Sequence, residues 1–372
     1  MRSALWYSRK YFIRRKKLTL TIFIIITIIA VFISFESAFY YQIEYRNTRT
    51  TQLFKRLIKI WLTNPVPSSN LSVIENIEGV DIVFPFMMLQ YEVRNLANDK
   101  SLSYPVEFVN LSVSEFLLEN LGYSEKIQGD LVLGFLIAIK LDVKPGDIIK
   151  IGGVNLSVSR ILPQTYSDLD LLILADIDIF NNYFASPELI DKYNGAYILI
   201  KQGADENLIA DKLRNKLSIR YILTPSEYAN ELERVSKIQL ISSLFFSLIA
   251  IIIGFSVITI YLYRDFEARK RELAILVALG AKRKQILFSF TLPMYILASL
   301  GIFMGCVVGF YVVIPYYHIF VYGYTRLFVL EAYIKAFITT TLLLSVTILL
   351  VTFMLHKRIK KIKAMEMLRA EI

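Results

Sequence analysis

Residues 264–286 read RDFEARKRELAILVALGAKRKQI, and this stretch decides how the rest of the chain is arranged. It carries ten charged residues, yet it encloses an apolar segment from Leu273 to Leu279. Runs without any charged residue flank it, at 238–263 and 286–314. Each run is long enough to cross a bilayer as a helix, which takes about 20 residues. Because a charge at the centre of a membrane helix costs about 2.5 to 3.5 kcal/mol, the sequence predicts that 264–285 is a loop between two membrane spans.

Four segments of the chain have the length and composition of membrane helices. The sequence is 55% hydrophobic and its mean hydropathy is +0.50, both high for a soluble protein. Glu36 and Lys335 are the only charged residues inside the four segments, and each lies near an end. The first segment exceeds the apolar core of a secretory signal peptide, so we expect an uncleaved anchor. The predicted spans are Leu18 to Tyr41, Ile238 to Tyr263, Ile286 to Ile314 and Tyr333 to Leu355.

Lysine and arginine predict the orientation of these spans. Seven lie in the first 17 residues, seven in the 264–285 loop and six after Leu355, which is 20 of the chain's 42. Short basic segments stay on the cytoplasmic side, so we expect a cell-membrane protein with both termini in the cytoplasm. Residues 42–237 then lie outside, with 20 basic and 25 acidic residues. The net charge of +10 thus reflects topology, and no nucleic-acid partner is expected.

The outer segment predicts an α+β domain large enough for its own core. Residues 144–162, KPGDIIKIGGVNLSVSRIL, predict two strands that reverse at Gly152-Gly153, because apolar and polar residues alternate beyond the glycine pair. Further strands are predicted at 80–86, 104–109, 171–174 and 196–200, and helices at 113–121, with Ser112 or Ser114 near the N-cap, and at 205–217.

Two helices are expected to carry this domain. Residues 42–62 keep a helical spacing of apolar side chains, and Ser226 to Lys237 reads as a capped helix that enters the second span without a break. The expected organisation is a basic N-terminus with the first span (1–41), a stalk helix and linker (42–70), the outer domain (71–225), a second stalk with the second span (226–263), a cytoplasmic coupling loop (264–285), the third span (286–314), an outer loop (315–332), the fourth span (333–356) and a basic cytoplasmic tail (357–372).

The sequence contains few residues that could serve catalysis or bind a metal. The chain has one cysteine, Cys306, and two histidines, and it contains no G-x-x-x-x-G-K-[ST] loop for nucleotide phosphates. The acidic stretch with Asp168, Asp170, Asp176 and Asp178 lacks the glycine and glutamate of a calcium loop, and side chains that flank a strand explain it more simply. We expect no metal, no cofactor and no catalytic residue. The sequons at Asn70, Asn110 and Asn155 allow glycosylation only in a host that glycosylates.

Gly301, Gly305 and Gly309 follow one another at steps of four in the third span. Small residues at this spacing let two helix backbones approach closely in a membrane. The seam predicts either a dimer contact or helix packing within one chain, and the sequence alone favours neither.

The loop itself predicts a short helix that is apolar on nearly all sides. Leu273, Leu276 and Val277 fall on one face, while Ile275, Ala278 and Leu279 fall on the other. Such a helix needs cover all round, which the membrane gives on one side and a soluble partner on the other. Gly280 suits its C-terminus, and Glu267 with Arg271 suits an ion pair four residues apart. A helix lying on anionic lipid is the alternative.

These residues are similar to a known signature. RKRELAILVALGAKRKQI, residues 269–286, resembles the loop of FtsX/MacB-type ABC transporter permeases, in which an arginine-rich run precedes R-E, an apolar helix and A-L-G-A. KAMEMLRAEI, residues 363–372, resembles the closing motif of that family, and KLDVKPGDIIKIGG, residues 140–153, resembles a motif of its outer domain. The resemblance implies a four-span membrane protein with a MacB-like outer domain between the first two spans.

The resemblance also implies a function. Members act as homodimers or close heterodimers on two copies of a separate ATPase, so the chain would transmit ATP-driven motion to its outer domain for export or extraction of a lipid, lipoprotein, peptide or drug. The alternative is a transmembrane regulator or scaffold that controls an extracellular hydrolase or signalling partner. Other expected partners are membrane lipids and a protein outside the membrane. The residues at the signature positions are Arg271, Glu272, Leu273, Leu276, Leu279 and Gly280.

Overall fold

The computed structural model describes residues 16–123, 129–278, 282–316 and 330–360. They form two compact units. One unit comprises Met1–Gln42, Ile238–Tyr317 and Phe328–Ile372, and the other comprises Ile43–Lys237 and His318–Leu327.

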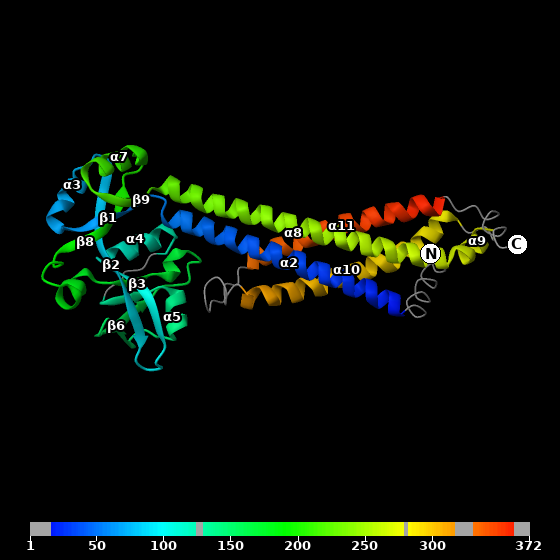
Figure 1. Cartoon of the computed structure of the whole chain (residues 1–372), viewed down its shortest axis with the longest axis horizontal. Coiled ribbons are helices and arrows are strands. Elements are labelled where there is room, and N and C mark those ends of the chain that lie inside the picture. Colours follow the sequence, from blue (N-terminus) through cyan, green and yellow to red (C-terminus); the bar gives the residue numbers. More distant parts are fainter. Residues whose placement is uncertain (1–15, 124–128, 279–281, 317–329, 361–372) are drawn as a thin grey trace. The chain divides into compact units, whose positions relative to one another are not determined.

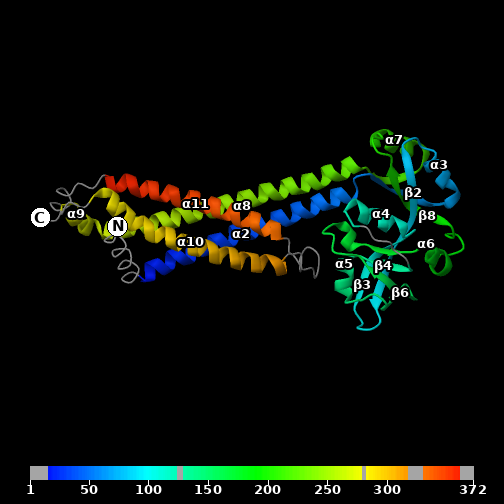
Figure 2. The ribbon, with the colours of Figure 1, turned by 180° about the vertical axis from the view of Figure 1, so that it is seen from behind.

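The first unit is a bundle of long helices. Four helices are long and apolar enough to cross a membrane, which confirms the four predicted spans. In both views the helices of this unit run side by side (Figure 1 and Figure 2). The helices that contribute to it are α2 (Lys16–Leu53), α8 (Pro225–Ala268), α9 (Lys270–Ala278), α10 (Arg283–Tyr316) and α11 (Leu330–Lys360).

Branched aliphatic side chains fill the centre of the bundle. Ile26 and Ile33 of α2 are buried against Ile258 of α8, Ile302 of α10 and Ile348 of α11. The outward faces of the same helices expose leucine, isoleucine and phenylalanine. A helix that is apolar all round is typical of a membrane span, because exposing its outer face to water would be unfavourable.

The second unit is an α+β domain built on one sheet (Figure 1). Its strands are β1 (Leu57–Pro67), β2 (Val80–Asn95), β3 (Ser101–Val109), β4 (Leu131–Leu133), β5 (Ile148–Ile151), β6 (Val154–Ile161), β7 (Ile173–Ala175), β8 (Lys192–Ile200) and β9 (Ile219–Leu223). Its short helices are η1 (Ser68–Asn70), α3 (Leu71–Glu75), α4 (Ser112–Asn120), α5 (Phe135–Leu141), η2 (Asp168–Leu171), α6 (Ile177–Ile179), η3 (Phe180–Phe184) and α7 (Glu206–Lys216).

The long strand β2 organises this sheet. The order is β3-β7-β4-β6-β5-β2-β8-β1-β9, and β3 also pairs with β2. The pairings β2, β3, β7, β4, β6 and β5 therefore close into a circuit of six strands, from which β8, β1 and β9 extend. β2 pairs with β8 along its first part and with β3 and β5 along its second part.

Separate apolar clusters fill the two parts of the sheet. Phe108, Val158 and Ile173 belong to the cluster of the six-strand circuit, which α5 joins through Ile137. α3 and α7 lie together in both views (Figure 1 and Figure 2), and their side chains join those of β1, β8 and β9 in a second cluster. A third cluster holds Leu53 and Phe54 against α4 and Phe86 of β2.

The hairpin of β5 and β6 follows the prediction closely. Its register pairs Ile151 with Val154 across Gly152-Gly153. Both glycines have positive φ, 52° and 99°, a conformation that glycine adopts without steric cost. The strands predicted at 80–86, 104–109 and 196–200 are also present, within β2, β3 and β8.

Other predictions are wrong in detail. The helix expected up to Leu62 ends at Leu53, and residues 57–67 form β1 within the sheet instead. The strand predicted at 171–174 begins later, as β7 at Ile173, and residues 168–171 form a 3₁₀ turn before it. The serine predicted near the N-cap of α4 is present, because Ser112 directly follows the N-cap residue Leu111 and donates to the Asn110 side chain from both its N–H and its hydroxyl.

Candidate functional site

α9 is the short helix that the loop signature predicts. α8 ends at Ala268 and α9 begins at Lys270. The backbone turns at Arg269, whose N–H donates to the Phe266 carbonyl at 3.1 Å. Phe266 and Leu273 are buried within the helical unit, and Leu273 is only 1% exposed. They anchor α9, so Leu273 is not available to a soluble partner.

The opposite side of α9 is exposed and mixes apolar with charged groups. Ile275 is 45% exposed, Arg271 and Glu272 of α9 are exposed as well, and so is Glu267 near the end of α8. Leu276 lies in α9; Leu279 and Gly280 lie outside the described residues. An exposed isoleucine among charged side chains is a surface that a protein partner can dehydrate. This surface can bind a partner, but these side chains include no nucleophile for covalent chemistry.

The three glycines of α10 lie against α2 of the same chain. A Cβ added at Gly305 would lie 2.7 Å from the Thr27 carbonyl oxygen, and one at Gly309 would lie 2.8 Å from that of Val31. One at Gly301 would lie 2.9 Å from Cγ2 of Ile26. The glycines therefore serve close packing within one chain, which is one of the two alternatives that the sequence left open.

The second feature of interest is a joint where α2 and α8 meet the outer domain, entirely within the second unit. Arg46 of α2 forms an ion pair with Asp168, and the Tyr228 hydroxyl of α8 donates to the same carboxylate. The Thr50 hydroxyl accepts from the Asp168 N–H at 3.2 Å. Burial first, and then the neighbouring Asp168, raise the pKa of Tyr228 well above its ordinary value. The hydroxyl therefore stays protonated and keeps donating.

Further contacts tie the two helices of the joint to each other. The Asn47 amide donates to the Leu232 carbonyl at 3.2 Å and to the Ser236 hydroxyl at 2.8 Å. The rings of Phe54 and Tyr228 meet edge to face at 4.8 Å. Sequence reasoning missed this joint, although arginine and asparagine beyond the end of an apolar span could have indicated it.

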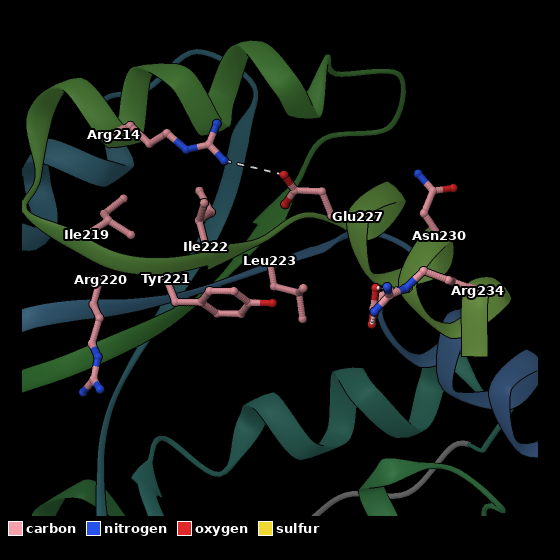
Figure 3. A pocket seen from close by; sticks show the side chains of 10 residues that line it. Arg214, Ile219, Arg220, Tyr221, Ile222, Leu223, Glu227, Asn230 and Arg234 are labelled. Atoms are coloured by element: carbon pink, nitrogen blue, oxygen red, sulfur yellow. Dashed lines mark hydrogen bonds and ion pairs between the residues drawn. The ribbon is translucent and has the colours of Figure 1, made fainter. Parts of the chain in front are cut away.

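α8 begins with a capping box. The Thr224 hydroxyl accepts from the Glu227 N–H at 3.2 Å, and the Glu227 carboxylate accepts from the Thr224 N–H at 3.2 Å. This reciprocal pair satisfies two backbone donors at the helix start. Glu227 also lies 3.5 Å from Arg214 of α7, as the dashed line in Figure 3 shows. The start of α8 is thus bound to the domain.

A groove of about 700 Å³ opens beside this capping box. Figure 3 shows β9 along it, with Arg214 of α7 on one side and Asn230 and Arg234 of α8 on the other. Tyr221 of β9 lines it and is 55% exposed. The five-residue strand and its groove were not predicted from the sequence.

The aspartates of the acidic stretch accept hydrogen bonds from nearby residues of the chain. Asp170 is buried and accepts from Thr165 N at 2.8 Å, Thr165 Oγ1 at 2.6 Å and Tyr166 N at 2.8 Å. Asp176 accepts from the Asp178 N–H at the start of α6. Within the described ranges, no group of three or more histidine, cysteine or acidic side chains could hold a metal ion.

Comparisons with known proteins agree with this arrangement. Residues 244–364 match the family model described as FtsX-like permease C-terminal. An uncharacterised ABC transporter permease of Methanocaldococcus jannaschii is 25% identical over 268 residues, which is 66% of this chain and 66% of that protein. The match thus spans just under two thirds of the relative's length.

Among solved structures, the chain is similar to a periplasmic region and an extracellular domain. The periplasmic region of MacB from Actinobacillus actinomycetemcomitans is 10% identical, with a TM-score of 0.36, covering 49% of this chain and 94% of that one. The extracellular domain of YknZ, a noncanonical ABC-type transporter from Gram-positive bacteria, is 11% identical, with a TM-score of 0.30, covering 43% and 87%. The family match over residues 244–364 and the similarity to an ABC transporter permease confirm the resemblance to FtsX-like permeases that the sequence predicts.

Proposed function

We propose that this chain is the membrane-spanning subunit of an ABC transporter of the FtsX/MacB type, and that it transmits motion of a separate ATPase to its outer domain. The observation that carries the proposal is α8. One uninterrupted helix, Pro225–Ala268, begins at the capping box of the outer domain and ends one residue before α9. Its backbone hydrogen bonds run along its axis, so a displacement at one end is passed to the other.

In the proposed assembly α9 is the docking element. Ile275 and its charged neighbours contact the ATPase, while Phe266 and Leu273 hold α9 to the membrane helices. Two copies of the chain, identical or closely related, bind two ATPase subunits. Both termini and residues 264–285 face the cytoplasm, and membrane lipid surrounds the bundle.

The chemistry of the assembly is divided between its chains. The ATPase binds and hydrolyses ATP, and this chain acts as a non-catalytic subunit without a cofactor. The joint at Arg46, Asp168 and Tyr228 receives the motion of the two helices. The outer domain then acts on a lipid, lipoprotein, peptide or drug for export or extraction.

The test is a charge placed on the exposed face of α9. We expect Ile275→Asp to abolish co-purification of ATP-hydrolysing activity from the native membrane, because the carboxylate would be desolvated in the contact. Ile190→Asp is the matched control, since Ile190 is 47% exposed but lies in the outer domain. It should retain the full activity. Undiminished activity bound to Ile275→Asp would contradict the coupling role of α9.

A further inference from the structure

The edge of the sheet at β9 carries backbone groups that no strand pairs. β9 is the last strand of the order, and within the described part of the chain it pairs only with β1. A strand at a sheet edge presents a row of N–H and C=O groups to which another extended chain can add. The groove of about 700 Å³ lies over this strand, between α7 and the start of α8 (Figure 3).

Recognition by strand addition needs side-chain selection as well as a free edge. Tyr221 offers an exposed ring that packs on Trp61 at 5.4 Å between centroids. Three arginines line the groove. Arg214 is paired with Glu227 at 3.5 Å, and Arg234 with Glu231 at 2.7 Å. Both lining glutamates are therefore already engaged.

Arg220 is the remaining cation of the groove. It is exposed at the second position of β9, where the register with β1 skips from Tyr221 to Ile219, and it has no ion pair among the described residues. A carboxylate on an added strand would complete a cross-strand pair with it. Opposite charges across neighbouring strands stabilise pairing, whereas like charges destabilise it.

The same charge argues against a second copy of β9 as the occupant. The strand reads IRYIL, with one arginine and no acidic residue. Antiparallel pairing of two such strands would bring their arginines near each other without a counter-charge. The groove therefore favours an acidic strand over a copy of itself.

We propose that β9 binds an extended, acidic segment of a partner protein outside the membrane, which adds as a further strand and pairs a carboxylate with Arg220. Thr224 follows β9 directly and caps α8. Only this residue separates the strand that would bind the segment from the long helix. The inference goes beyond the proposed function and does not depend on ATPase binding at α9.

The experiment uses the full chain in lipid nanodiscs and two capped hexapeptides, one alternating glutamate with valine and one alternating lysine with valine. Hydrogen–deuterium exchange across residues 217–224 reports strand addition, and anisotropy of labelled peptide reports affinity. We expect the glutamate peptide to slow exchange there and the lysine peptide to have no effect. Arg220→Glu should weaken the glutamate peptide by about fivefold or more, the scale of an exposed ion pair that turns repulsive, and should admit the lysine peptide.

A glutamate peptide with N-methylated amides on alternate residues is the matched control, because it keeps the charge and loses the strand donors. It should not slow exchange. The proposal is overturned if the glutamate peptide leaves residues 217–224 unprotected, if the N-methylated or lysine peptide protects them equally, or if the chain protects them by self-association. Binding of the ATPase to the same preparation is measured separately, so a failure at β9 is distinct from a failure at α9.

Discussion

At the scale of single residues, the outer domain contains a buried ion pair between strands. Lys59 of β1 is 8% exposed, and its Nζ lies 2.7 Å from Oε1 of Glu107 and 2.6 Å from the Tyr197 hydroxyl. The rings of Trp61, Phe86 and Tyr197 surround the ammonium at 4.4 to 5.0 Å from its nitrogen. The pair costs desolvation, which the carboxylate, the hydroxyl and the rings offset together.

Removing one member of this pair should be worse than removing both. We expect Lys59→Met to lower the free energy of unfolding by about 3 to 5 kcal/mol, because it leaves the Glu107 carboxylate buried and unpaired. Lys59→Met with Glu107→Leu should recover most of that loss. Urea unfolding of the Trp6→Phe protein measures this, since Trp61 is then its only tryptophan. A double variant as unstable as the sum of the single variants would contradict the expectation.

Asp170 gives a pH-dependent prediction. Burial raises the pKa of this carboxyl above 3.8, although the hydrogen bonds from Thr165 and Tyr166 lower it in part. The folded state therefore binds the proton more tightly than the unfolded state, and this stabilisation is present at low pH and lost as pH rises through the folded pKa. Relative to Asp170→Asn, the wild type should lose stability as pH rises above the carboxyl's ordinary pKa of 3.8. Urea unfolding over a series of pH values measures the stability of the wild type relative to that of the variant, and a relative stability that grows with pH would contradict the expectation.

At the scale of elements, the close approach of α10 to α2 predicts a steric effect. We expect Gly305→Leu to separate the helices and lower the melting temperature in detergent, because even its Cβ would lie 2.7 Å from the Thr27 carbonyl oxygen. Val307→Leu is the control on the same helix, since Val307 is exposed on the apolar outer face. Melting curves followed by circular dichroism compare the two. Equal melting temperatures would exclude a tight seam.

The elements also show where sequence reasoning succeeds. Membrane spans, the β5–β6 hairpin and α9 were predictable because each depends on local signals: uninterrupted apolar length, a glycine pair between alternating residues, and an apolar run among charges. β1 was misread because Leu57, Ile60 and Trp61 also fit a helical spacing, and burial on both faces hides the alternation of a strand. The joint at Arg46, Asp168 and Tyr228 joins distant parts of the sequence, so no local pattern contained it.

At the scale of the whole molecule, the distribution of charge predicts which parts face the cytoplasm. Cys306 is buried and is the only native cysteine, so Cys306→Ala gives a clean background for labelling. In intact cells a membrane-impermeant maleimide should label Ile190→Cys at once and Glu267→Cys only after permeabilisation. Mass-tagged maleimide and gel mobility measure both. Labelling of Glu267→Cys in intact cells would invert the topology.

The continuity of β2 has a mechanical consequence. β9, β1, β8 and β2 are consecutive neighbours in the sheet, and β2 continues unbroken into the six-strand circuit. A pull on β9 would stretch several cross-strand hydrogen bonds in parallel at every step, so the load is shared and no loop yields first. The strands of the domain should therefore move together under force. Cleavage of the β2–β3 turn at residues 96–100 should leave the connection from β9 through β1 and β8 to β2 intact.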